Sequence, residues 1–240
     1  MRRLLSLTVL AAVIVPLTTG PLPAQEKQDK KKVKKANPVL AQIEDKPGLP
    51  RVLLIGDSIS MGYTLPVREM LAGKANVHRP AANCASTKAG VLKINDWLGD
   101  KKWDVIHFNW GLHDIVFHDA NGKNATPATG SHQVAIADYE KNLRELVKRL
   151  KATNAKLIWC ATTPVPAGTT NREAGDEVKY NEIAAKIMQD EGIPTDDLYA
   201  FALPQLEKIQ LPKNVHFTPE GSKVLAQKVS EEILKQLPAK

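Results

Sequence analysis

From Arg51 onward, short apolar runs alternate with longer segments of helical periodicity, and this alternation restricts the possible fold most strongly. The runs RVLLIG (51–56), WDVIHFNW (103–110) and AKLIWCATTP (155–164) are mostly apolar, and weaker runs occur in ANVHRP (75–80) and IPTDDLY (193–199). Strands that are buried on both faces carry such runs, and they are typical of parallel sheets with helices on each side. The sequence therefore predicts an α/β fold.

Helices are expected between these strands, where apolar residues recur every three or four positions. The first is expected to begin at Pro66, and the last to begin after Thr218 as N-cap, with Pro219 as its first residue. The other expected helices are TKAGVLKINDWLGD, ADYEKNLRELVKRLKATN and EVKYNEIAAKIMQDEG. The strands are too few for an eight-fold barrel, so we predict a three-layer α/β/α sandwich with a parallel, flavodoxin-like, doubly wound sheet.

The first 24 residues have the order of a secretory signal. Arg2 and Arg3 precede an apolar run, and small residues then lead to an expected cleavage site at Ala24. The apolar run is short for a membrane span and is interrupted by Pro16. We expect residues 1–24 to be a signal peptide and the mature protein to be exported to the periplasm or the extracellular space. An uncleaved N-terminal anchor is the alternative; after cleavage, no stable membrane span is expected.

Residues 25–48 are expected to form a basic, flexible tether, and residues 49–240 the folded domain. The formal net charge is +7, of which Arg2 and Arg3 supply +2 and residues 25–36 supply +4, leaving +1 for the remainder. The folded part is therefore nearly neutral, and its charge does not favour nucleic acid as a partner. The expected partner is a small-molecule or polysaccharide ester; the oligomeric state is not predicted.

The two cysteines, Cys84 and Cys160, allow either a disulfide or two buried free thiols. The CxxC and Cys/His spacings of a zinc site are absent from the sequence, as is a phosphate-binding glycine loop. We therefore expect neither a metal nor a cofactor.

Four polar segments follow the predicted strands: GDSIS, NCAST, NWGLHD and TTPVPAGTTN. In an open parallel sheet, chemistry gathers at the carboxyl ends of the strands. Ser58 follows the first strand, where a serine is either a nucleophile or a helix cap. A serine hydroxyl needs a base to become a nucleophile, and His216, just before the last helix, can reach the same end of the sheet. His216 alone could equally be a packing residue.

The remaining candidates concern the oxyanion and the substrate. His113 follows a strand and a glycine, so its ring N–H could face a developing oxyanion, whereas Asp114 is expected to tie loops together. A main-chain N–H of Ala85 or Ser86 could be a further donor, although NCAST could also be a plain connecting loop. Trp110 is a possible residue of a substrate rim. The polar loop 117–132 could line a sugar site or be a surface insertion, and His107 is expected in the core.

These segments, in this order, resemble the SGNH (GDSL) hydrolase family from about residue 51 to the end of the chain. GDSIS looks like the family's first block, which supplies the nucleophile and corresponds to Ser58. NCAST stands where the second block has an oxyanion glycine. GLHD looks like the third block, usually Gly-x-Asn-Asp, with His113 at the asparagine position. KNVHFTPEG looks like the last block, usually Asp-x-x-His, with His216 as the base.

The sequence departs from the family at the acid that orients the histidine. Lys213 stands three residues before His216, where the aspartate is expected, and Asn214 stands two before. Asn214 or a main-chain carbonyl could hold the imidazole instead. Loss of the acid's charge lowers catalysis severely in other hydrolases, so reduced or lost activity is an open alternative.

The resemblance implies a secreted serine esterase that hydrolyses an ester, with carbohydrate O-acetyl groups as the expected substrate. The missing acid leaves a second hypothesis, a catalytically weak or silent carbohydrate-binding or cell-surface module of the same fold. A lipase or thioesterase is a third, less favoured, interpretation.

Overall fold

Five parallel strands form the central sheet of the computed structural model, which describes residues 37–238. The order across the sheet is β2 (Asn76–His78), β1 (Arg51–Ile55), β3 (Val105–Phe108), β6 (Lys156–Cys160) and β7 (Thr195–Asp196). Numbered along the chain within this sheet, the order is 2-1-3-4-5, that of flavodoxin-like doubly wound folds. The predicted fold class is confirmed. The predicted signal peptide and residues 25–36 of the expected tether lie outside the described residues.

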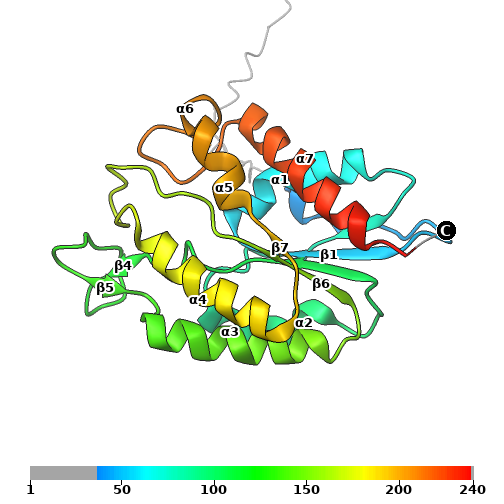
Figure 1. Cartoon of the computed structure of the whole chain (residues 1–240), viewed down its shortest axis with the longest axis horizontal. Helices are drawn as coiled ribbons and strands as arrows, with labels where there is room; N and C mark the ends of the chain where they lie inside the picture. Colours follow the sequence, from blue (N-terminus) through cyan, green and yellow to red (C-terminus); the bar gives the residue numbers. More distant parts are fainter. Residues whose placement is uncertain (1–36, 239–240) are drawn as a thin grey trace, which may run out of the picture. The chain divides into compact units, whose positions relative to one another are not determined.

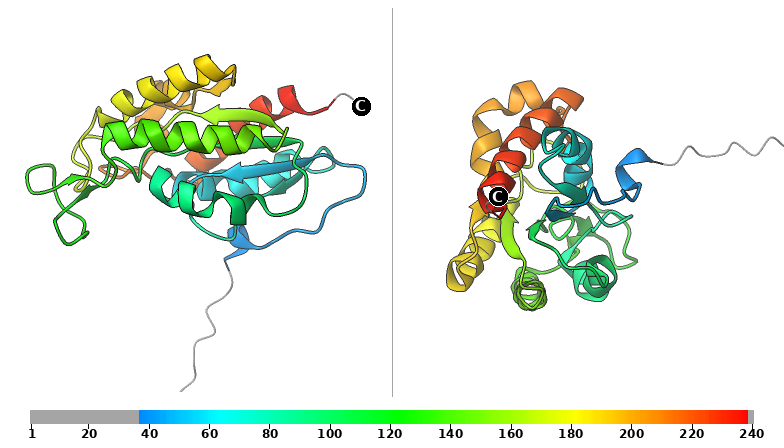
Figure 2. Two further views of the ribbon diagram at one scale, coloured as in Figure 1. Left: turned by 90° about the horizontal axis from the view of Figure 1, so that it is seen from below. Right: turned by 90° about the vertical axis from the view of Figure 1, so that its right-hand side faces the viewer.

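Helices cover both faces of the sheet (Figure 1). On one face α1 (Ser58–Met70) packs against α7 (Pro219–Gln236), and α7 also contacts β3, β6 and β7. On the other face lie α2 (Thr87–Leu98), α3 (Ile136–Lys151) and α4 (Asp176–Glu191), with α3 between the other two (Figure 2). This arrangement explains the apolar strands, because side chains on both faces of the sheet are buried.

Several short elements were not predicted from the sequence. They are η1 (Pro38–Leu40), β4 (Phe117–His118), β5 (Ser131–His132), α5 (Leu198–Ala202), η2 (Leu203–Gln205) and α6 (Leu206–Ile209). The antiparallel pair β4–β5 forms a separate two-stranded sheet within the polar loop 117–132. His132 of β5 lies 2.8 Å from Asp176 at the start of α4, so this loop is tied to the domain.

The first helix begins earlier than predicted. It starts at Ser58, and Pro66, expected as its first residue, lies inside it. Asp57 is the N-cap: its Oδ1 accepts a hydrogen bond of 2.9 Å from the N–H of Ile59. Proline removes one main-chain hydrogen bond from a helix, but burial of the stripe formed by Ile59, Tyr63 and Val67 stabilises the segment.

The expected boundary between tether and domain at residue 48 is too late. In the part of this segment that the structure describes, the carbonyl of Ala41 accepts a hydrogen bond of 3.2 Å from Arg68. Asp45 lies 2.6 Å from His78, and the carbonyl of Lys46 accepts one of 3.0 Å from Asn76. Residues 37–48 therefore belong to the folded domain.

Within residues 37–238 no helix is both long enough and apolar enough to cross a membrane.

Candidate active site

Ser58 is the first residue of α1, three residues after the end of β1. The strand turns into the helix at Gly56, where an added Cβ would lie 2.9 Å from both Cβ and Oγ of Ser60. Only glycine allows this close approach without a shift. The turn places Ser58 at the carboxyl end of the sheet, where its main-chain N–H is one of the free donors of a helix N-terminus.

His216 reaches Ser58 from the other end of the chain. Its Nε2 lies 2.8 Å from Oγ of Ser58, although 158 positions separate the two residues. The loop that carries His216 folds back on itself: the N–H of Leu211 donates to the carbonyl of His216 at 2.9 Å. Thr218 then caps α7 as predicted, through its hydrogen bond of 2.9 Å with the N–H of Gly221.

Asn214 occupies the position of an orienting acid beside His216. Its Oδ1 lies 2.7 Å from Nδ1 of His216 and also accepts a hydrogen bond of 3.0 Å from the main-chain N–H of His216. The main-chain donor fixes which amide atom is oxygen. Because that oxygen can only accept, Nδ1 carries the hydrogen, and Nε2 is free to accept the hydroxyl proton of Ser58.

The main-chain N–H groups of Ala85 and Ser86 in the NCAST loop differ in whether they already donate a hydrogen bond. Ala85 has a left-handed main chain (φ 47°), and its N–H already donates to Oδ1 of Asn83 at 2.9 Å. Ser86 is the buried N-cap of α2, and its N–H donates to no acceptor within the described residues. Of the two residues named from the sequence, Ser86 has the N–H that is free to bind an oxyanion.

Asp114 joins two of the loops, as expected. Its buried carboxylate accepts hydrogen bonds from the N–H of Thr87 at 2.9 Å and from the Thr87 hydroxyl at 2.5 Å. Burial raises the pKa of Asp114 to about 7, although the bonds from Thr87 oppose the rise. The contact fixes the GLHD loop to the first turn of α2.

His113 belongs to the GLHD loop and is partly buried. Burial is the main reason why the pKa of His113 is lowered; Asp57 opposes the shift, whereas Arg172 and His216 add to it. A neutral imidazole still has one N–H to donate, which an oxyanion can accept.

Trp110 does not lie at a rim, and this expectation is wrong. Its side chain is fully buried, and its Nε1 donates to the carbonyl of Cys84 at 3.3 Å. A Cβ on Gly90 of α2 would lie 3.0 Å from the indole ring, so the ring fills the space between helix and sheet. Trp110 is a core residue that also holds the NCAST loop.

Sequence reasoning missed two arginines that hold the loops of the site. The fully buried Arg79 donates to the carbonyl of Gly56 at 3.2 Å and to the carbonyl of Ala82 at 3.1 Å, so it links GDSIS to the residue that precedes NCAST. Arg172 donates through Nε to the carbonyl of Leu112 at 2.7 Å, next to His113. Neither arginine lies in a recognisable motif, so no local signal identified them.

Both cysteines are free and buried, which decides between the two alternatives left open by the sequence. Burial raises the pKa of Cys84 to about 11. Cys160, His107 and Asp196 form the one group of three possible metal ligands found within residues 37–238, and their ligand atoms lie within 4.8 Å of one another. His107, buried as expected, lies 3.0 Å from Asp196 through Nε2. All three side chains are buried, so this group is not a site open to substrate.

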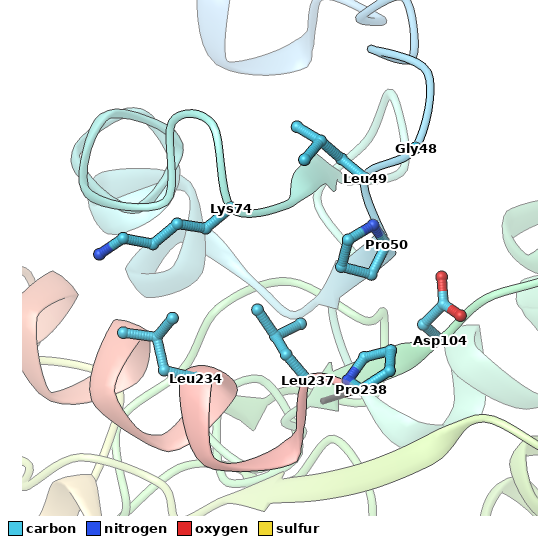
Figure 3. A pocket seen from close by; sticks show the side chains of 8 residues that line it. All are labelled: Gly48, Leu49, Pro50, Lys74, Asp104, Leu234, Leu237 and Pro238. Atoms are coloured by element: carbon cyan, nitrogen blue, oxygen red, sulfur yellow. The ribbon is translucent and has the colours of Figure 1, made fainter. Parts of the chain in front are cut away.

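A surface cavity of about 690 Å³ lies away from Ser58 and His216, at the amino ends of the strands. Pro50 precedes β1, Asp104 precedes β3, and Leu237 follows α7. Figure 3 shows Leu49, Pro50, Leu234 and Leu237 facing one another, with Lys74 and Asp104 at opposite sides. It is separate from the candidate active site.

A flavodoxin-like sheet with a Ser–His–Asn arrangement at its carboxyl end defines a hydrolase of the SGNH type. The sequence profile of the GDSL-like Lipase/Acylhydrolase family matches residues 54–224, so the chain belongs to this family. The resemblance inferred from the motifs is confirmed. No curated protein matches the sequence significantly.

Solved structures share the fold at low sequence identity. An acetyl xylan esterase, AlAXEase, is 20% identical with a TM-score of 0.62, covering 76% of this chain and 99% of its own. A lipase/acylhydrolase from Enterococcus faecalis is 19% identical with a TM-score of 0.64, covering 80% and 99%. TesA is 14% identical with a TM-score of 0.58, covering 78% and 99%.

Proposed function

We propose that the protein is a secreted serine esterase with Ser58 as nucleophile, His216 as general base and Asn214 as the residue that orients His216. One observation carries the proposal: Ser58, His216 and Asn214 form a continuous hydrogen-bonded chain, with heavy-atom distances of 2.8 and 2.7 Å. Nucleophile, base and orienting group in this order are the elements of a serine hydrolase.

In the proposed reaction, Nε2 of His216 takes the hydroxyl proton of Ser58 as Oγ attacks the ester carbonyl carbon. The N–H groups of Ser58 and Ser86, together with the ring N–H of His113, hold the oxyanion. Collapse of this tetrahedral intermediate expels the alcohol, which receives the proton from His216, and leaves an acyl-serine. Water then attacks that ester with His216 again as base, which releases the acid and restores Ser58.

A carbohydrate O-acetyl group is the proposed substrate. The similarity to an acetyl xylan esterase supports this choice by analogy of fold. Export, proposed from residues 1–24, would bring the enzyme to extracellular polysaccharides.

The alternative, a weak or silent carbohydrate-binding or cell-surface module, is favoured by the neutral amide beside His216. Asn214 cannot supply the negative charge that stabilises an imidazolium during catalysis. No carboxylate of residues 37–238 forms a hydrogen bond with the His216 ring. Hydrolysis of p-nitrophenyl acetate by the wild-type protein and by Ser58→Ala distinguishes the two: equal rates would exclude the esterase.

A chain-length series of p-nitrophenyl esters tests the acetyl preference. We expect kcat/KM to be highest with acetate and to fall with longer acyl chains. An optimum with octanoate or longer would favour a lipase or thioesterase instead.

A further inference from the structure

The loop that follows β6 lies between the loops that carry His113 and His216. On one side, the carbonyl of Asn171 accepts a hydrogen bond of 2.9 Å from the N–H of Phe117, and Arg172 contacts the carbonyl of Leu112 at 2.7 Å. On the other side, a Cβ on Gly168 would lie 3.2 Å from Cγ of Lys213. The segment 166–172 therefore forms a wall between the two halves of the candidate active site.

Two cations, Arg172 within this wall and Lys213 beside it, lack carboxylate partners in the part of the chain that the structure describes. Arg172 is partly buried; its Nη1 donates to Oδ1 of Asn171 at 3.1 Å, and its Nη2 donates to no residue that the structure describes. Neither Arg172 nor the exposed Lys213 forms a salt bridge within residues 37–238. Burial lowers the pKa of Arg172, and the negative charge of Asp57 opposes that shift.

The acidic groups near this wall do not neutralise it. Asp57 is buried and caps α1 through the N–H of Ile59. Glu173, next to Arg172, acts on Lys179 of α4, where it adds weakly to the effect of Asp176 in raising the pKa of Lys179. Glu220 lies in the first turn of α7, beyond His216. A partly buried guanidinium without a counter-ion is costly, and an anionic ligand would remove that cost.

We propose that Arg172, assisted by Lys213, binds an anionic group, carboxylate or sulfate, on the alcohol part of the ester substrate. The substrate class is then an acylated acidic saccharide rather than a neutral one. A guanidinium presents parallel N–H donors that match two oxygens of either anion, and Nη2 is free to be one of them. The inference rests on the proposed esterase function, because it assigns the substrate of the same site.

Binding without turnover tests the inference independently of catalysis. Ser58→Ala protein is titrated with neutral xylo-oligosaccharides, galacturonic acid oligosaccharides and sulfated galactose oligosaccharides at low and high salt. We expect at least one acidic ligand to bind about tenfold tighter than the neutral one, as charge-assisted hydrogen bonds predict. This preference should shrink with salt. The carboxylate and sulfate arms identify which anion is preferred.

The Ser58→Ala/Arg172→Gln double variant is expected to lose most of the preference for the acidic ligand, and Arg172→Lys to retain part of it. Arg144→Gln, on the exposed face of α3, is the matched control and should keep the preference. Equal binding of neutral and acidic ligands would overturn the inference. So would an Arg172→Gln variant, with an unchanged circular dichroism spectrum, that weakens both ligand classes equally, since Arg172 would then only position Leu112.

Kinetics on acetylated polygalacturonate and acetylated xylan provide the second measurement. The ratio of the two kcat/KM values should favour the acidic polymer in the wild type and fall about tenfold in Arg172→Gln. If neither polymer nor p-nitrophenyl acetate is hydrolysed, the proposed function fails, but the binding preference still decides whether Arg172 recognises an anion.

Discussion

The amide oxygen of Asn214 lies 2.7 Å from Nδ1 of His216, where a serine hydrolase commonly has a carboxylate. The same oxygen accepts the main-chain N–H of His216, so the ring is held in the tautomer that a general base requires. Asn214 therefore supplies the orientation that an acid gives but not its charge.

Asn214→Asp should raise kcat/KM for p-nitrophenyl acetate by about tenfold or more, because a carboxylate stabilises the imidazolium that forms during attack. The acidic limb of the pH–rate profile should also move to higher pH, since the carboxylate favours protonation of His216. Asn214→Ala should lower the rate by removing the orienting bond. A variant Asn214→Asp with unchanged rate and profile would show that the charge at this position has no part in catalysis.

Arg79 is predicted to be essential for stability. Its guanidinium also donates to Oγ of Ser60 at 3.1 Å and to Oγ1 of Thr64 at 3.0 Å. Arg79→Ala would leave several buried acceptors without donors, each costing about 1–3 kcal/mol. We expect the free energy of unfolding in urea to fall by about 3 kcal/mol or more. Arg144→Ala, which removes only the surface ion pairs with Glu140 and Asp190, should change it by about 1 kcal/mol or less; similar losses in both variants would contradict this role for Arg79.

Asp114 should make stability fall as pH rises. Its pKa of about 7 in the folded protein lies above the ordinary aspartate value of 3.8, so between about pH 4 and 7 the folded state holds a proton that the unfolded state has lost. The native state is thereby destabilised by about 1.4 kcal/mol for each pH unit within that window. Urea unfolding of wild type and Asp114→Asn at pH 5 and pH 8 measures the effect.

The difference in unfolding free energy between Asp114→Asn and wild type should become more positive at pH 8 than at pH 5. A difference independent of pH would mean that Asp114 is ionised throughout this range.

Gly111 is predicted to admit no side chain. An added Cβ would lie 2.1 Å from Oγ1 of Thr162, on the neighbouring loop. Gly111→Ala should therefore displace the GLHD loop and lower both stability and activity. Adding Thr162→Ala removes the hydroxyl and should restore part of both, as measured by thermal unfolding and by p-nitrophenyl acetate hydrolysis. If Thr162→Ala restores neither stability nor activity, the contact with the Thr162 hydroxyl is not the reason why Gly111 is required.

The fold was predictable because the strands are buried on both faces and therefore carry continuous apolar runs. The nucleophile and base candidates were predictable because each lies in a motif beside a strand end or a helix start. The start of α1 could not be predicted, because Pro66 suggests that a helix begins there. The Asp57 cap and the buried face with Tyr63 instead extend the helix toward its N-terminus, to Ser58.

Contacts between distant loops account for the other misses. Nothing local distinguishes a rim tryptophan from a buried one, and Trp110 is buried because Gly90 of α2 leaves room for its ring. Arg172 contacts Leu112 from 60 positions away, so its place beside His113 depends on the folded arrangement of two loops. Such partners follow from tertiary packing and not from spacing along the chain.

The most direct test of the central claim is covalent labelling of Ser58 by a fluorophosphonate, followed by peptide mass spectrometry. The reagent reacts with a serine whose hydroxyl proton is taken by a neighbouring base. We predict stoichiometric modification at Ser58 in the wild type, and labelling slowed by at least about a hundredfold in His216→Ala. No modification of Ser58, or equal labelling rates with and without the imidazole, would contradict the assignment of Ser58 and His216 as nucleophile and base.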